Sequence, residues 1–281
     1  MSGLRRIVRF RLPAFARHWF VVVAGVALVL SATSPLVAQP PTATINLTGV
    51  NPSGASLAGV YTSPYEGTVN GGSTIPIICD DFADDSFVPE QWSAYVTSLS
   101  SLTSSPADSY LKWGTNNDVT GTDTISGTWN LTQLQAYDAA AILSVDILQS
   151  TPGSLTQEYL SYALWSLFDS KDALAQLSAY SVDPTTVEND LNAALIAATT
   201  GSISGESLSS YLSNYNVNIY SYVPGTPTSC DGGYCPPPPQ EFISVSVAEP
   251  PSPALLVADL LALAGLFFIA RRRLTRSVNL R

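Results

Sequence analysis

The residues of this chain that could do covalent chemistry are three cysteines, Cys79, Cys230 and Cys235. Cys230 and Cys235 enclose the flexible sequence Asp-Gly-Gly-Tyr, which can bring their Cα atoms within disulfide range. We therefore predict a local Cys230–Cys235 disulfide, formed in an oxidising compartment. Cys79 is then the unpaired thiol, in the segment Ile-Ile-Cys-Asp-Asp-Phe. Because cysteines of apolar strands are commonly buried and inert, this is the first expectation for Cys79.

Histidine is almost absent from the chain, since the only one is His18. If residues 1–38 are removed, no histidine remains. A Ser-His-Asp triad, a Cys-His pair or a His-ligated metal site then cannot be built. We accordingly expect no catalytic residues, no metal and no cofactor.

Acidic side chains offer two further kinds of site. Hard oxygen ligands for Ca²⁺ could come from two segments. These ligands are Asp80, Asp81, Asp84 and Asp85 in the first, and Asn116, Asn117, Asp118 and Asp123 in the second. The second segment has Gly127 where an EF-hand loop requires Glu, so we expect both to be solvated acidic loops. Paired carboxylates could also make a glycosidase, but no spacing among these acids singles out a pair.

The charges are few and unevenly distributed. Charged residues make up 12% of the chain, against roughly 25% in an ordinary soluble domain. Residues 39–253 hold 21 Asp and Glu, and subtracting Lys112 and Lys171 leaves a formal charge of about −19. No basic patch exists there to neutralise phosphates, which excludes nucleic-acid binding.

The N-terminal region has the three parts of a secretory signal peptide. Five arginines precede an apolar run at residues 20–30, and small residues precede Gln39. We predict cleavage between Ala38 and Gln39 and export by the general secretory route. A retained membrane helix is the alternative, but the apolar run is short for the roughly 20 residues that span a bilayer.

A second apolar segment, at residues 254–270, is just long enough to cross a bilayer. Arg271, Arg272 and Arg273 follow it directly and should stay on the cytoplasmic side. Residues 39–253 would then face outside. Asp259 lies within the run, where a carboxylate costs a few kcal/mol, and this argues against a permanent, freestanding anchor.

The order Glu249-Pro250, apolar helix and arginine cluster resembles the PEP-CTERM sorting signal of Gram-negative bacteria. Glu249 and Pro250 match the second and third residues of its Pro-Glu-Pro motif, whereas Ala248 replaces the first proline. The resemblance implies processing in the inner membrane by an exosortase after export. It further implies a place on the cell surface or in a biofilm matrix, with extracellular polysaccharide as a partner. A plain type I membrane anchor is the alternative.

Short apolar segments bounded by turn residues predict strands at residues 43–50, 57–62 and 74–79. Apolar residues at helical spacing predict helices at 133–149, behind a Thr132 cap, and at 156–168. A third helix should start after Asp183-Pro184 and end near Gly201. Strands are expected again at residues 215–223 and 241–247.

Strands, then helices, then strands indicate one α+β domain over residues 39–223. Residues 98–130 are expected to be irregular, anchored by Trp113 and Trp129. Four consecutive prolines mark residues 224–248 as a stiff linker, in which the strand at 241–247 either stands alone or folds back on the domain. Residues 249–281 form the sorting region.

Three segments together carry a second resemblance. They are Cys79-Asp80-Asp81-Phe82, residues 137–143 and residues 161–169. This pattern resembles that of PEP-CTERM surface proteins and is similar to bacterial thioester domains, adhesin modules in which a Cys side chain bonds a Gln side chain. It implies a related fold over residues 43–223, with Cys79 at the thioester position. In those domains the Gln lies four residues before a Trp, but here Ser161 stands four residues before Trp165, and Gln157 lies eight residues before it.

The sequence thus predicts a non-enzymatic exported protein of the cell surface or the extracellular matrix. A thioester-type adhesin that uses Cys79 is the first alternative, and a carboxylate-based surface glycosidase is the second. Trp92, Trp113, Trp129 and Trp165 could stack on sugars, although aromatic residues at strand or helix spacing are more often core residues.

Overall fold

The computed structural model describes residues 39–50, 54–104, 108–113, 129–230 and 238–248, together with Leu261. The predicted signal peptide with its Ala38 cleavage site lies outside these residues. So do the sorting residues Glu249, Pro250, Arg271, Arg272 and Arg273 and, except for Leu261, the predicted membrane helix. Within the part of the chain that is described, no helix has the length and apolarity needed to cross a membrane.

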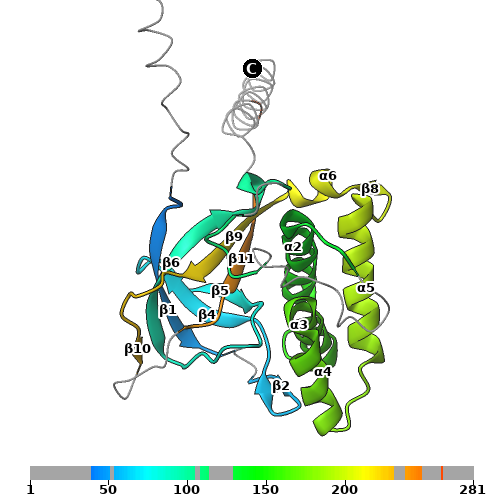
Figure 1. The fold of residues 1–281 in the computed structure, drawn as a ribbon, viewed down its shortest axis with the longest axis horizontal. Helices are drawn as coiled ribbons and strands as arrows, with labels where there is room; N and C mark the ends of the chain where they lie inside the picture. The colour runs from blue at the N-terminus through cyan, green and yellow to red at the C-terminus, as the bar shows by residue number, and fades with distance from the viewer. Residues whose placement is uncertain are drawn as a thin grey trace, which may run out of the picture. The chain divides into compact units, whose positions relative to one another are not determined.

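Antiparallel strands form one large sheet that closes on itself (Figure 1). Its strands are β1 (Thr42–Gly49), β4 (Tyr65–Val69), β5 (Ile75–Cys79), β6 (Glu90–Ser98), β9 (Tyr215–Tyr222), β10 (Ser229–Cys230) and β11 (Phe242–Val247). The order is β1-β4-β5-β11-β9-β6-β10, and an additional pairing of β1 with β6 closes it. Alternate residues point inward, as Ile45 and Leu47 of β1 do with no exposed surface.

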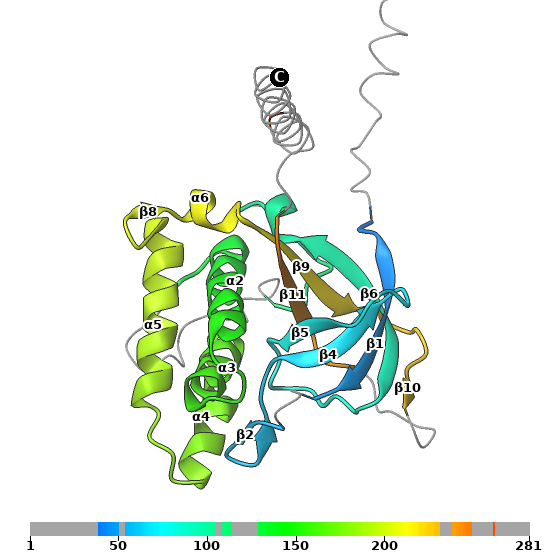
Figure 2. The same cartoon turned by 180° about the vertical axis from the view of Figure 1, so that it is seen from behind.

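The helices form a layer beside the sheet (Figure 2). They are α2 (Gln133–Gln149), α3 (Leu155–Phe168), α4 (Ser170–Ala179), α5 (Thr185–Thr200) and the short α6 (Leu208–Leu212). The predicted Thr132 cap is confirmed, because its side chain accepts from the Gln135 N–H and the Gln135 side chain accepts from the Thr132 N–H. α5 ends at Gly201, as predicted, and this glycine has the left-handed conformation. Helices and antiparallel strands in one unit confirm the α+β class.

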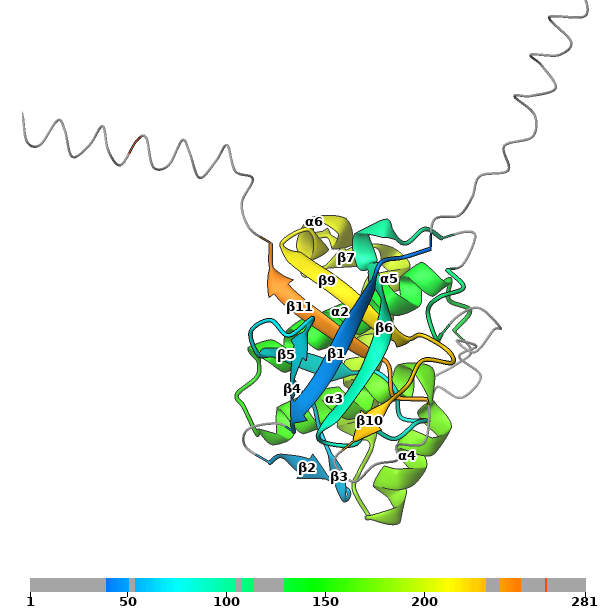
Figure 3. The same cartoon turned by 90° about the vertical axis from the view of Figure 1, so that its left-hand side faces the viewer.

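β11 is the strand whose position the sequence left open. It lies between β5 and β9, with Phe242 opposite both Cys79 and Tyr220. Figure 3 shows it crossing the domain beside β9. The segment after the proline run is therefore part of the sheet rather than a separate element.

Three local predictions were wrong. Residues 57–62 form not one strand but a tight hairpin of β2 (Ser56–Leu57) and β3 (Val60–Tyr61), because Ala58 and Gly59 have positive φ angles of 50° and 80°. β4 lies between the second and third predicted strands, where no strand was predicted. Also unpredicted were β6, β10, α4, α6, the one-turn 3-10 helix η1 (Leu99–Ser101), and the small hairpin of β7 (Ser202–Ile203) and β8 (Glu206–Ser207).

Candidate functional site

A cluster of carboxylates lies inside the domain where β5 ends and β11 begins. Asp80 and Asp81 follow β5 directly, and Glu241 precedes β11. Because Phe242 pairs with Cys79, the Asp80 N–H donates to the Glu241 carbonyl at 3.4 Å. The exposed fraction is 0% for Asp80 and Asp81 and 1% for Glu241. We call Asp80, Asp81, Asp84, Lys112 and Glu241 the acidic cluster.

The prediction that Asp80 and Asp81 lie in a solvated loop was therefore wrong. A charged carboxylate is buried only when donors replace its water, and Asp81 has several. Its Oδ1 accepts from the N–H groups of Ala83 at 3.0 Å and Asp84 at 3.4 Å. Its Oδ2 accepts from the Glu241 N–H at 3.2 Å and forms an ion pair with Lys112. The Ala83 and Asp84 donors belong to the predicted loop itself, whereas Glu241 and Lys112 come from distant parts of the chain.

Lys112 enters the cluster from the segment 108–113, which α2 holds in place. The Gln133 side chain donates to the carbonyls of Asp108 at 3.0 Å and Trp113 at 2.7 Å, and it accepts from the Asp108 N–H at 2.6 Å. The Lys112 Nζ also lies 2.5 Å from Asp84 Oδ2 and 4.6 Å from the centre of the Trp113 ring. The lysine is thus fixed between two carboxylates.

Both carboxylate oxygens of Glu241 also accept hydrogen bonds. Its Oε1 accepts from the Tyr137 hydroxyl at 2.5 Å, and its Oε2 accepts from the Ser221 hydroxyl and from the Lys112 N–H at 3.0 Å. Burial raises the pKa of Glu241, and these hydrogen bonds oppose that rise.

Asp80 differs from Glu241, since neither of its oxygens has a hydrogen-bond partner among the described residues. Burial, together with the charges of Glu241 and Asp81, raises the pKa of Asp80 well above its usual range. We infer that Asp80 carries a proton while Glu241 is ionised, because two adjacent buried carboxylates do not both ionise readily.

Cys79 is a free thiol with no exposed surface. Its Sγ donates to the Asp81 carbonyl at 3.0 Å, and its own carbonyl accepts from Trp165 Nε1 at 3.0 Å. Burial, followed by the charge of Asp81, raises the pKa of this thiol well above its usual value. The predicted buried cysteine is confirmed, and its thiolate form is disfavoured.

Ser161 and Gln157 of α3 are both buried. The Ser161 hydroxyl donates to the Gln157 carbonyl at 3.0 Å. The Gln157 side chain donates to the Ile147 carbonyl and accepts from the Gly153 N–H, each at 2.9 Å. The Gln157 carboxamide is therefore used to join α2 to α3.

The other predicted sites have the following positions. Cys230 is disulfide-bonded, but Cys235 lies outside the described residues, so their pairing stays a prediction. The acidic segment 116–123 also lies outside them. In the described ranges, the acidic cluster included, no group of three or more His, Cys, Asp or Glu side chains is arranged to hold a metal ion. Trp92, Trp113 and Trp165 are buried core residues, and Trp129 packs against the core.

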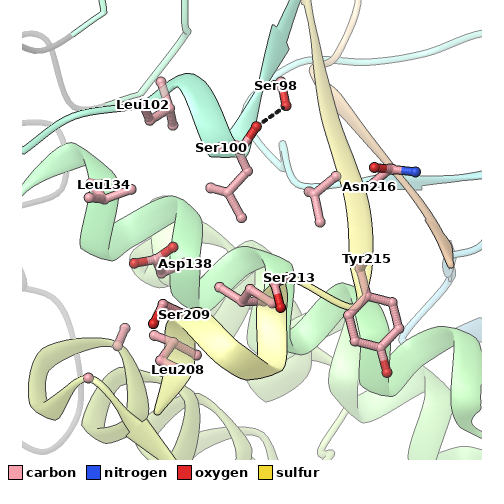
Figure 4. Close-up of a pocket in the computed structure, with 15 residues that line it drawn as sticks. Ser98, Ser100, Leu102, Leu134, Asp138, Leu208, Ser209, Ser213, Tyr215 and Asn216 are labelled. Carbon is pink, nitrogen blue, oxygen red and sulfur yellow. Dashed lines mark hydrogen bonds between the residues drawn. The ribbon is translucent and has the colours of Figure 1, made fainter. Parts of the chain in front are cut away.

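A separate cavity of about 660 Å³ lies where η1, α2, α5, α6 and β9 meet (Figure 4). Apolar side chains such as Leu134 and Leu208 line it together with serine hydroxyls and Asp138. Burial raises the pKa of Asp138 to about 6. Among the described residues that line this cavity, Asp138 is the only charged one.

Sequence reasoning missed Lys112, Tyr137 and Glu241 as site residues. Lys112 carried one signal, because it is one of two basic residues in a strongly acidic region. Tyr137 begins one segment of the second resemblance, but nothing there indicated its role, and Glu241 carried no signal. Their approach depends on packing between elements more than 100 residues apart.

No protein-family model and no curated protein sequence matches this chain. Two solved structures from Streptococcus pyogenes are similar. The N-terminal domain of the pilus tip adhesin Cpa is 12% identical, with a TM-score of 0.35, over 77% of this chain and 98% of that one. The N-terminal thioester domain of the fibronectin-binding protein SfbI is 11% identical, with a TM-score of 0.36, over 78% and 98%. These scores indicate loose superposition.

Proposed function

We propose that this chain is a non-enzymatic protein of the bacterial cell surface or extracellular matrix. In this proposal a signal peptide directs export from a Gram-negative cell, and the region from Glu249 to Arg273 serves as a PEP-CTERM-like sorting signal for an exosortase. The folded domain binds components outside the cell, extracellular polysaccharide among them, and catalyses no reaction on them.

The observation that carries the proposal is the location of the acids. Asp80, Asp81 and Glu241 lie inside the domain, and the oxygens of Asp81 and Glu241 already accept hydrogen bonds from the protein. A glycosidase needs two carboxyl groups facing each other across a cleft, roughly 5–10 Å apart. These side chains instead stabilise the junction of β5, β11 and α2.

The cavity beside α6 supports binding rather than catalysis. Asp138 is the only acid among its described lining residues, so the two-carboxylate mechanism lacks its second group there. Serine hydroxyls and apolar side chains around one carboxylate suit a ligand that has both an apolar face and hydrogen-bond donors.

The thioester-type adhesin is disfavoured as a rival by the surroundings of Cys79. The thiol is buried and already donates to the Asp81 carbonyl, and Ser161 has no carboxamide to form the bond. If another Gln did complete the bond, the chain would lose one molecule of ammonia.

The test of the proposal is the mass of the exported protein purified from its native host, with fragment mapping of both ends. We expect a chain that begins at Gln39 and ends near Glu249. The variant Glu249→Ala/Pro250→Ala should keep the C-terminal region, while a control with two linker substitutions, Pro236→Ala/Pro237→Ala, should be processed normally. A wild-type chain that retains residues 254–281 would contradict the sorting signal. Surface labelling of intact cells would then show whether it is a plain anchor.

Enzymatic activity is tested with the same preparation. We expect incubation with the host's own purified polysaccharide to leave its chain length unchanged and to retain the protein in a co-sedimentation assay. Shortened polysaccharide, with activity lost in Asp138→Asn, would contradict the non-enzymatic proposal.

A further inference from the structure

The geometry points to a modification site within the acidic cluster: an intramolecular amide bond between Lys112 Nζ and Asp81 Cγ. This bond would join the end of β5 to the segment 108–113. It is independent of the proposed surface function, because it concerns only groups inside the domain.

The nucleophile and the electrophile are already in contact. Lys112 Nζ pairs directly with Asp81 Oδ2, and the Gln133 hydrogen bonds hold the lysine segment in place. The Asp81 side chain has no exposed surface. Holding two reacting groups in contact removes most of the entropy cost of bringing them together, which can be equivalent to many kcal/mol of barrier.

The backbone around Asp81 is arranged to stabilise the charge that the reaction would develop. Attack by an amine places negative charge on the carboxyl oxygen that does not leave. Asp81 Oδ1 accepts from the N–H groups of Ala83 and Asp84, so it is the oxygen that these donors stabilise. Oδ2, which faces Lys112, is then the leaving oxygen. Burial also raises the pKa of Asp81, which favours the protonated acid that an amine can attack.

The lysine needs a base, and Asp84 can act as one. Burial lowers the pKa of Lys112, but the charges and hydrogen bonds of Asp81 and Asp84 raise it above its usual value. Asp84 Oδ2 lies 2.5 Å from Nζ, within reach of the ammonium proton. The Asp84 side chain is 23% exposed, so it can pass this proton to solvent.

The reaction balances without another reactant. Asp84 takes one proton from the Lys112 ammonium and passes it to solvent, while Asp81, ionised in the resting ion pair, takes up one proton from solvent at Oδ2. The neutral amine then attacks Cγ of the protonated Asp81. The C–N bond forms, the C–Oδ2 bond breaks, and the hydroxyl leaves as water with a second proton from the nitrogen. A cavity of about 250 Å³ borders Lys112, Asp84 and Glu241 and can hold the released water.

Three lysine and aspartate variants of the full-length chain test this bond. The proteins are purified after export from the native host, reduced and alkylated, and their intact masses are compared with those calculated for the mapped ends. Lys112→Arg keeps the positive charge but removes the amine, and Asp84→Asn removes the base. Lys171→Arg is the matched control, because Lys171 is the other lysine of the domain and is exposed on α4.

We expect the wild type and Lys171→Arg to be lighter by one water, and Lys112→Arg and Asp84→Asn to have full mass. Trypsin should cut the denatured wild type after Lys171 but not after Lys112, because an amide-linked lysine is not a trypsin site. A wild type of full mass, cut after both lysines, would overturn the proposal and leave an ordinary ion pair. Water loss retained in Asp84→Asn would overturn the role of Asp84. This wild-type result does not depend on whether the variants fold.

Loss of ammonia is a different outcome and is assigned by mapping. At Gln39 it reflects cyclisation of an N-terminal glutamine, and at Cys79 it would revive the thioester rival. Because trypsin cuts this domain only after lysine, Gln39, Cys79, Asp81 and Lys112 lie in one fragment. Fragment-ion sequencing then assigns a loss of ammonia to Gln39 or Cys79 and a loss of water to the link between Lys112 and Asp81, so the two proposals can fail separately.

Discussion

Removing the Tyr137 hydroxyl tests whether Glu241 is ionised in the folded protein. In Tyr137→Phe the ring keeps its packing, since Tyr137 is 1% exposed and lies against Phe168 with ring centres 5.4 Å apart. The change removes the hydroxyl that donates to Glu241 Oε1 at 2.5 Å and accepts from the Trp113 N–H at 3.4 Å. The expected effect therefore comes from hydrogen bonding alone.

The magnitude follows from the charge of the acceptor. A hydrogen bond to a charged group contributes about 1.5–3 kcal/mol to stability, against about 1 kcal/mol for a neutral pair. We expect Tyr137→Phe to lower the free energy of unfolding by about 2–3 kcal/mol, which in a domain of this size lowers Tm by about 4–12 °C. The loss should become smaller as the pH is lowered and Glu241 takes up a proton.

The assay is urea unfolding at neutral and acidic pH, with thermal melts of the same proteins. Tyr220→Phe is the control, because the Tyr220 hydroxyl is also buried but pairs with the neutral Ser244 hydroxyl at 2.9 Å. If Tyr137→Phe lowers the free energy of unfolding by no more than Tyr220→Phe does, and by the same amount at both pH values, the inference that Glu241 is ionised is refuted.

Two further predictions concern titration and reactivity. Because the folded-state pKa of Asp138 is about 6 and the unfolded value is near 3.8, the folded state binds the proton more tightly, and the free energy of unfolding should fall as pH rises from about 4 to 6. Between pH 4 and pH 7, the free energy of unfolding of Asp138→Asn should therefore rise by about 1–2 kcal/mol relative to that of the wild type, after allowance for solvent screening. Equal pH profiles of the two proteins in urea titrations would refute this. Without reductant, Cys79 should resist iodoacetamide in the native protein and react in urea, since burial keeps it as a thiol. Rapid labelling of the native protein, or no labelling in urea, would contradict this.

Elements whose signals are local could be predicted from the sequence. α2 and α5 follow from Thr132, Gly201 and the apolar periodicity between them, because caps and helix faces depend on residues a few positions apart. β6 carried a strand signal that was overlooked, since Trp92, Ala94 and Val96 alternate along a segment rich in strand-forming residues. The hairpin at Ala58-Gly59 was missed because a positive φ at alanine is a property of its tertiary setting.

The residues of the candidate site likewise divide into those that local sequence indicates and those that depend on tertiary packing. The sequence identified Cys79 and the acids after it, and it placed Ser161 where a thioester would need Gln. It could not tell that the acids are buried, because burial depends on donors that arrive from Lys112, Tyr137, Ser221 and Glu241 on other elements.

Composition, charge and terminal patterns by themselves determined the expectation of an acidic, histidine-free exported domain, because these are additive properties of the residues. Only the tertiary structure decided that β11 lies between β5 and β9 and brings Glu241 beside Asp80. Strand order depends on which long-range pairings bury the most apolar surface while leaving the fewest polar groups unpaired, and one sequence does not display that balance. The contact between Lys112 and Asp81, on which the proposed amide depends, is a product of that packing.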